Sequence, residues 1–166
     1  MPELAQSYVH GASATPLIGD TIGVHFDRAV ARWPEADALV VRHQGIRWTY
    51  SDLQREVDAL AAGLLALGLE RGDRVGIWSP NNAEWVVTQF ATAKAGIILV
   101  NVNPAYRLTE LEYAINKVGC KALITQRLLG RATTSACSTN SCLSSNPVSQ
   151  GHYRRTDCLI CARSFV

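Results

Sequence analysis

The sequence lacks the residue patterns by which most catalytic and metal-binding sites are identified. Its four histidines show no metal-ligand spacing, and no Gly-rich run precedes a helix with the Lys and Ser/Thr of a phosphate-binding loop. His43 falls in an expected hairpin turn, where a solvated side chain is commoner than a general base. We therefore assign no catalytic, cofactor-binding or metal-binding residue.

Long hydrophobic runs and targeting signals are also missing. No stretch approaches the roughly 20 apolar residues of a membrane span, so we expect no membrane-spanning segment. The first residues, Met1 to Gln6, carry neither a basic segment nor an apolar one, and the first Arg is Arg28. These features predict a cytoplasmic protein whose cysteines stay reduced.

Acidic residues nearly disappear after residue 126. Of 14 Asp and Glu only Asp157 follows it, whereas five of 16 Lys and Arg and four of five cysteines do. Ser and Thr are crowded there too, and apart from Tyr153 no aromatic residue is interleaved with the basic ones, which argues against nucleic-acid binding. Two different compositions meet near Gln126, and we expect residues 127–166 to be a disordered tail.

Apolar periodicity predicts alternating helices and strands up to residue 126, and the 166 residues have room for one domain. We expect an arm over residues 1–20, a helix from Thr21 to Pro34, a hairpin of 38–41 and 46–50, and a helix over 51–68. Further strands are expected at 75–78, 97–102 and 121–125, separated by helices that end at Gly96 and Gly119. This order predicts an α/β fold with a parallel sheet.

Polar residues mark the expected helix starts. The candidate caps are Thr49 with Asp52 or Ser51 with Gln54 for the second helix, Asn81 or Asn82 for the third, and Thr109 with Glu112 for the fourth. The four tryptophans, Trp33, Trp48, Trp78 and Trp85, lie near apolar neighbours. We expect them to pack in the core.

One cysteine pair has the spacing of a zinc knuckle or a redox site. Cys158 and Cys161 are separated by two residues, and Cys137, Cys142 and His152 could in principle add further ligands. A structural zinc ion needs four ligands held tetrahedrally, and no second pair stands at a suitable distance. Zinc binding by the tail is therefore an alternative to disorder.

Two segments resemble the first core motifs of the adenylate-forming (AMP-binding) superfamily. They are Trp48-Thr-Tyr-Ser-Asp-Leu53 and Ala93-Lys-Ala-Gly-Ile-Ile-Leu-Val-Asn-Val-Asn-Pro104. Val102-Asn-Pro-Ala-Tyr106, followed by Glu110-Leu-Glu-Tyr113 and Lys117-Val-Gly-Cys-Lys-Ala122, is most similar to the fatty and medium-chain acyl-CoA synthetase branch. The resemblance covers about residues 16–125.

The resemblance implies the N-terminal part of the large domain of an acyl-CoA synthetase, truncated after residues 21–126. Members of the family join a fatty acid to coenzyme A at the expense of ATP, with Mg²⁺, through an acyl-adenylate. The family's phosphate loop, adenine- and ribose-binding motifs and lid lysine all follow the matched region. Fatty acid, ATP and CoA are therefore expected as partners of the full-length family only, and this chain is expected to need no cofactor and to be inactive.

The change at Gln126 has a testable explanation. Read two bases later, with a free choice of synonymous codons, the segment from Leu128 to Phe165 can encode an amphipathic helix followed by Leu-Pro-Asp-Leu, which resembles the family at this place. The hypothesis is that residues 127–166 are a frameshifted Ser/Cys/Arg-rich tail. Such a tail would leave the sheet partly uncovered, so we expect a marginally stable or aggregation-prone chain.

A different class of function stays open beside the inactive fragment. A parallel sheet that stops after its first strands leaves an unpaired edge, which a small non-catalytic module can use to bind a partner. The oligomeric state does not follow from the sequence.

Overall fold

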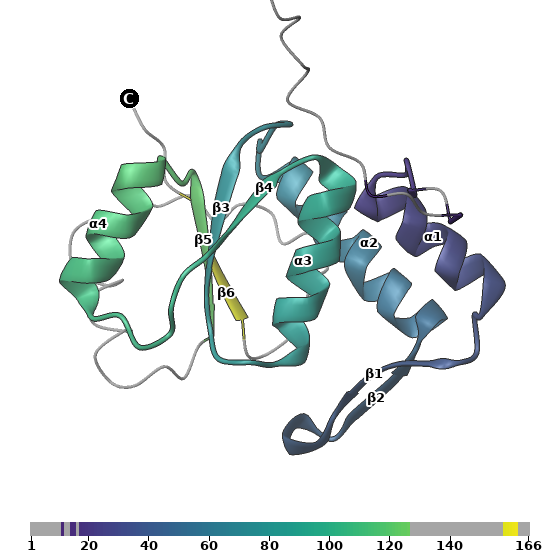
Figure 1. Ribbon diagram of the computed structural model, residues 1–166. Helices are drawn as coiled ribbons and strands as arrows, with labels where there is room; N and C mark the ends of the chain where they lie inside the picture. The colour runs from purple at the N-terminus through teal and green to yellow at the C-terminus, as the bar shows by residue number, and fades with distance from the viewer. Residues whose placement is uncertain (1–10, 12–13, 16, 127–157, 163–166) are drawn as a thin grey trace, which may run out of the picture.

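The computed structural model describes residues 11, 14–15, 17–126 and 158–162 (Figure 1). Its elements, in chain order, are α1 (Ile22–Arg32), β1 (Asp37–Val41), η1 (Arg42–Gln44), β2 (Ile46–Thr49), α2 (Tyr50–Ala66), β3 (Arg74–Trp78), α3 (Ala83–Ala95), β4 (Ile98–Asn101), α4 (Leu108–Val118), β5 (Ala122–Gln126) and β6 (Cys158–Ala162). The α/β class and the order of elements up to residue 126 are confirmed. None of the described helices is both long and apolar enough to cross a membrane.

The sheet that organises the molecule has the strand order β4-β3-β5-β6. Both neighbours of β3 run parallel to it, with Gly76 opposite Val100 of β4 and opposite Leu123 of β5. Helices cover both faces, α3 on one side and α4 on the other (Figure 1). This arrangement explains why the apolar residues of β3 are not confined to alternate positions.

The larger core lies between the sheet and the layer formed by α1, α2 and α3. Val75 and Ile77 of β3 are fully buried in this core, which also contains Val57 and Leu64 of α2 and Val87 of α3. Apolar residues recur along α2 at helical spacing, and this helix therefore presents one apolar face to the core. These contacts fix α3 beside the strand that precedes it.

A smaller core lies on the opposite face of the sheet, under α4. It contains Trp78, Val102 and Leu111, all buried, with Val100 and Leu123 packed against them. Leu111 is the one buried residue of α4, so this helix covers its face of the sheet less completely than α3 does.

An antiparallel hairpin, β1 with β2, stands apart from the main sheet (Figure 1). The 3-10 turn η1 joins the two strands, and Gly45 follows it with a φ of 64°. A left-handed residue at this point favours glycine. The hairpin predicted from the sequence is therefore confirmed.

Helix caps decide two of the open alternatives and correct a third prediction. At α2 the capping box is Thr49 with Asp52, because Asp52 N–H donates to Thr49 Oγ1 at 3.2 Å and Thr49 N–H donates to Asp52 Oδ2 at 3.1 Å. Asn82 caps α3. The predicted pair Thr109 with Glu112 is wrong, because α4 begins earlier and Glu110 reaches back to the backbone N–H of Arg107 at 2.8 Å.

Two further expectations differ from the structure. Trp33 is 48% exposed, with the Arg32 guanidinium 4.6 Å above its ring, because α1 ends at Arg32 and the chain turns away from the core. The tail was expected to be disordered throughout, yet Cys158–Ala162 forms β6 against β5, since the outer edge of β5 offers unpaired backbone groups. Residues 127–157 and 163–166 lie outside the described residues.

Candidate functional site

The carboxyl ends of the three parallel strands lie at one edge of the sheet. In open α/β sheets ligands bind outside this edge, where successive connections leave to opposite sides. Here the β3–α3 turn, residues 79–82, and the segment after β4, residues 102–107, lie there. These two turns are therefore where a site would form in the described part of the chain.

The first turn is occupied by the protein's own side chains. Asn82 Nδ2 donates to Ser79 Oγ at 2.8 Å, and Trp85 N–H donates to Asn82 Oδ1 at 2.9 Å. Gln44, from the distant hairpin turn, accepts a hydrogen bond from Ala83 N–H at 2.7 Å through its Oε1. These backbone N–H groups at the start of α3 are thus already taken.

A buried carboxylate stands at the same helix end. Glu84 is 5% exposed, and Gln44 Nε2 donates to its Oε2 at 2.8 Å. An acidic side chain in the first turn is favourable for the helix dipole, but it repels a phosphate. Helix N-termini bind nucleotide phosphates through free N–H groups and positive potential, and α3 offers neither at these positions. The residues present here do not fit the phosphates of ATP.

The second turn, residues 102–107, is hydrogen-bonded to β3. Trp78 Nε1 donates to the carbonyl oxygen of Asn103 at 3.1 Å, and Asn103 Oδ1 accepts from Ala105 N–H at 2.9 Å. The Asn side chain thus closes its own turn, as Asn does in many turns. The motif residues at 102–106 act here as a fixed connection between β4 and α4.

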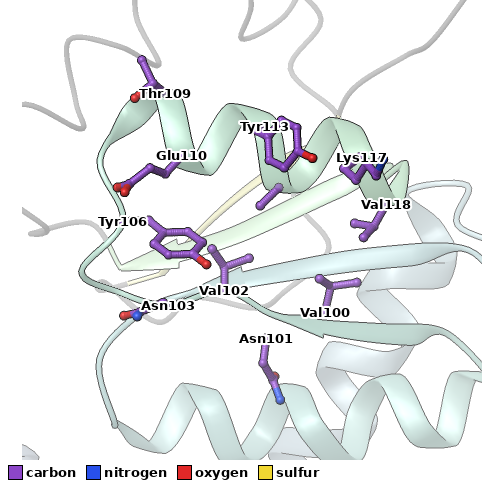
Figure 2. Close-up of a pocket in the computed structure, with 11 residues that line it drawn as sticks. Val100, Asn101, Val102, Asn103, Tyr106, Thr109, Glu110, Tyr113, Lys117 and Val118 are labelled. Carbon is purple, nitrogen blue, oxygen red and sulfur yellow. The ribbon is translucent and has the colours of Figure 1, made fainter.

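A groove of about 600 Å³ runs between β4 and α4 (Figure 2). Val100 and Val102 form its apolar floor, and Tyr106, Tyr113 and Lys117 stand on the opposite wall. The other lining residues are Asn101, Asn103, Thr109, Glu110, Ala114 and Val118. Because Glu110 already caps α4, the groove has the features of a binding surface and shows no nucleophile held by a base.

A cluster of three charged side chains lies elsewhere, where α1, α2 and α3 meet. Lys94 Nζ lies 2.7 Å from Asp27 Oδ1 and 2.5 Å from Asp58 Oδ1. Hydrogen bonds from Lys94 and then Gln54 lower the pKa of Asp27 against the opposing effect of burial. Burial lowers the pKa of Lys94, but the hydrogen bonds to Asp27 and Asp58 outweigh it and raise the pKa overall. This cluster joins three helices and does not border the groove.

Metal and thiol chemistry find little support in the described part of the chain. No group of three or more His, Cys, Asp or Glu is placed there to hold a metal ion. Burial raises the pKa of the Cys120 thiol, which keeps it in its unreactive protonated form. Cys158 and Cys161 both lie within the extended strand β6, whereas a chelating pair at this spacing needs a turn. The other proposed ligands, Cys137, Cys142 and His152, lie outside the described residues.

Sequence reasoning identified the elements around both turns but missed Gln44, which holds the start of α3, and Lys94, which joins α1, α2 and α3. Gln44 and Lys94 act over 40 and 67 residues of sequence separation, respectively. Neither belongs to a local pattern that predicts its partner. His43, the neighbour of Gln44, is exposed in η1 and is not brought close to another candidate.

Comparison with solved structures agrees with this fold. A Mycobacterium tuberculosis fatty acyl CoA synthetase is 24% identical and superposes with a TM-score of 0.67 over 74% of this chain and 24% of that chain, a likeness of fold. The N-terminal domain of FACL13 from the same organism is 25% identical with a TM-score of 0.68, over 73% of this chain and 31% of that chain.

Sequence comparison is more specific. The medium-chain acyl-CoA ligase ACSF2, mitochondrial, of Danio rerio is 52% identical over 75% of this chain and 20% of its own length. The acyl-CoA ligase SID4 of Ajellomyces capsulatus is 40% identical over 74% of this chain and 21% of its own length. The chain thus spans about a fifth of the length of these curated relatives. The family described as AMP-binding enzyme matches residues 26–160, and the chain belongs to that family.

Proposed function

We propose that residues 21–126 are the opening part of the N-terminal domain of an ATP-dependent fatty acyl-CoA synthetase. The complete enzyme would convert a fatty acid, ATP and CoA to acyl-CoA, AMP and pyrophosphate through an acyl-adenylate. The observation that supports this best is the identity of 52% to a ligase of medium-chain acids, confined to a fifth of that ligase.

The described residues contribute a scaffold to that reaction. They provide three parallel strands, the helices that cover them and the fixed turn at 102–106, while the start of α3 is closed to phosphate by Asn82, Gln44 and Glu84. ATP, Mg²⁺ and CoA would be held by parts of the relatives that lie outside the fifth matched by this chain. We therefore propose that the 166-residue chain has no ligase activity by itself.

An ATP–pyrophosphate exchange assay tests this proposal. The purified chain is incubated with ATP, Mg²⁺ and fatty acids of several lengths, beside the Danio rerio ligase as a positive control. We expect exchange with the control and none above background with the chain. Fatty-acid-dependent exchange by the chain alone would refute the proposed inactivity. Circular dichroism on the same sample establishes that the protein assayed is folded.

The tail is part of the same proposal. We infer that residues 127–166 arise from a shifted reading frame, because their composition changes abruptly at Gln126. The DNA sequence of codons 120–166 tests this directly. A shifted frame that meets stop codons, or that shows no similarity to the synthetases, would refute it.

A second candidate function rests on the free edge of the sheet. No described strand pairs with the outer side of β4, and Ile98 on that strand is 50% exposed. Such an edge accepts an extended segment of a partner, which would make the chain a non-catalytic binding module. Gel filtration with candidate partner proteins separates the two: a stoichiometric hetero-complex favours the module.

The cytoplasmic location predicted from the sequence stays a prediction. The ACSF2 relatives are mitochondrial by name. Fractionation of cells that express the complete gene, with immunodetection of the chain, decides between the two compartments.

A further inference from the structure

The edge of β5 is covered by a strand from a distant part of the chain. β6 pairs with β5 over the whole length of both strands, from Ala122 opposite Ala162 to Gln126 opposite Cys158. The pairing is antiparallel, whereas β3 pairs in parallel with both β4 and β5. The strand order β4-β3-β5-β6 places β6 next to β5, on the side away from β3; Figure 1 draws β6 in yellow, behind the other strands.

No tight turn sets this pairing. Residues 127–157 separate the two strands, and hairpin loops have about two to five residues. Among the described elements, β6 makes extensive contact with β5 alone. The described contact of β6 is therefore the backbone ladder with β5, and α1, α2 and α3 take no extensive part in it.

Without β6, the edge of β5 would be prone to pair with another chain. Its sequence, Ala-Leu-Ile-Thr-Gln, has no charge and no proline, the two features that usually protect an edge strand. Ala122, Ile124 and Thr125 are buried, so β5 is held straight and in place by the core on its faces. A fixed, uncharged edge with free N–H and C=O groups is a template for pairing with another chain.

From these observations we propose that residues 158–162 guard the β5 edge: they occupy a strand-acceptor site on this sheet and so prevent two copies of the chain from pairing there. The occupant is this chain's own segment. When β6 leaves, β5 accepts an extended segment from a second copy. The proposal does not depend on the ligase reaction.

The register supplies a way to lock the strand. Gln126 lies directly opposite Cys158, and directly opposed residues in an antiparallel pair have Cα atoms about 4.5–5.5 Å apart, within the range of a disulfide. Gln126→Cys should therefore crosslink to Cys158 under mild oxidation. Thr125→Cys is the matched control, because its opposite residue is Leu159. Peptide mapping by mass spectrometry identifies the linked cysteines.

Prolines supply a way to open the strand. Successive N–H groups of a strand point to opposite edges. Of two double variants, Leu159→Pro with Cys161→Pro and Cys158→Pro with Ile160→Pro, one therefore removes donors to β5 and the other removes donors on the opposite edge of β6. Both carry the same number of prolines. The outer edge of β4 is identical in all variants, so differences between them report on the β5 edge.

The measurements are hydrogen exchange of the β5 amides and sedimentation velocity. We expect one proline pair to raise β5 exchange at least tenfold and to increase self-association, with α3 amides unchanged. Oxidised Gln126→Cys should crosslink to Cys158 at least tenfold faster than Thr125→Cys crosslinks to any cysteine, and should associate less than its own reduced form. The proposal is overturned if neither proline pair changes β5 exchange or association, or if Gln126→Cys links without preference to Cys137, Cys142 and Cys158.

Discussion

The side-chain amide of Gln44 donates to the buried carboxylate of Glu84 at 2.8 Å, although 40 residues separate them. The same Gln44 accepts from Ala83 N–H at 2.7 Å, so one side chain satisfies two groups at the start of α3. The hairpin is thereby fixed against the helix that follows the central strand. This contact also closes the helix end to phosphate.

Replacing Gln44 tests that contact. Gln44→Ala removes a donor to Glu84 and an acceptor for Ala83 N–H, and loss of a partner at a buried polar group costs about 1–3 kcal/mol. We expect the free energy of unfolding in urea to fall by that amount. The control is His43→Ala, an exposed neighbour in the same turn, for which we expect almost no change. Equal stabilities for the two variants would contradict the assigned role of Gln44.

The capping box at α2 gives a prediction that separates two alternatives. Thr49→Ala removes the Oγ1 that accepts from Asp52 N–H, which should lower the free energy of unfolding by about 1 kcal/mol. Ser51→Ala removes the cap of the competing alternative and should have little effect, because the structure places Ser51 inside the helix. Thermal denaturation followed by circular dichroism compares them. A larger loss of stability from Ser51→Ala than from Thr49→Ala would contradict the assignment of Thr49 as the cap of α2.

The Lys94 cluster predicts a change in the titration of one carboxyl group. The pKa of Asp27 is lowered chiefly by the hydrogen bond from Lys94. Lys94→Met should therefore raise the pKa of Asp27, as measured by NMR titration of its carboxyl carbon. Lys117→Met removes the same charge from the exposed side of α4 and is the control. An unchanged pKa in Lys94→Met would show that the cluster does not form in solution.

Stability should also fall in acid. The pKa values of Asp27, Asp52 and Asp73 are lowered from the ordinary 3.8, through Lys94, the Thr49 backbone and Lys121 respectively. A carboxyl group with a lowered folded-state pKa contributes stability that is complete above its unfolded pKa and is lost as the pH falls through the folded value. We expect the free energy of unfolding to decline below about pH 4. A constant value from pH 7 to 3 would refute this.

Two glycines should respond in opposite directions to the same substitution. Gly96 ends α3 with a φ of 72°, and an added Cβ would lie 3.0 Å from Arg71 Cγ, so Gly96→Ala should lower the free energy of unfolding by about 1–2 kcal/mol. Gly63 lies inside α2, and nothing stands within 4 Å of an added Cβ. Gly63→Ala should raise the free energy of unfolding by about 0.5–1 kcal/mol. Chemical denaturation of the pair checks both signs.

Local patterns in the sequence determined most of the elements up to residue 126. The apolar stripe of α2, the stops at Gly96 and Gly119, and the hairpin turn at Gly45 each depend on neighbours within a few residues. The motifs at 48–53 and 93–104 were likewise sufficient to identify the family. Such features are readable because helix periodicity, glycine conformation and turn chemistry are local properties.

Only the tertiary structure decided which distant groups meet. Gln44 at the start of α3, Lys94 between Asp27 and Asp58, and β6 on the edge of β5 all join residues far apart in the sequence. The choice of Thr49 over Ser51, and of Glu110 over Glu112, likewise followed from where each helix begins once it packs on the sheet. Long-range pairing is set by the burial of whole faces and by the satisfaction of backbone groups at sheet edges, and no local sequence signal records either.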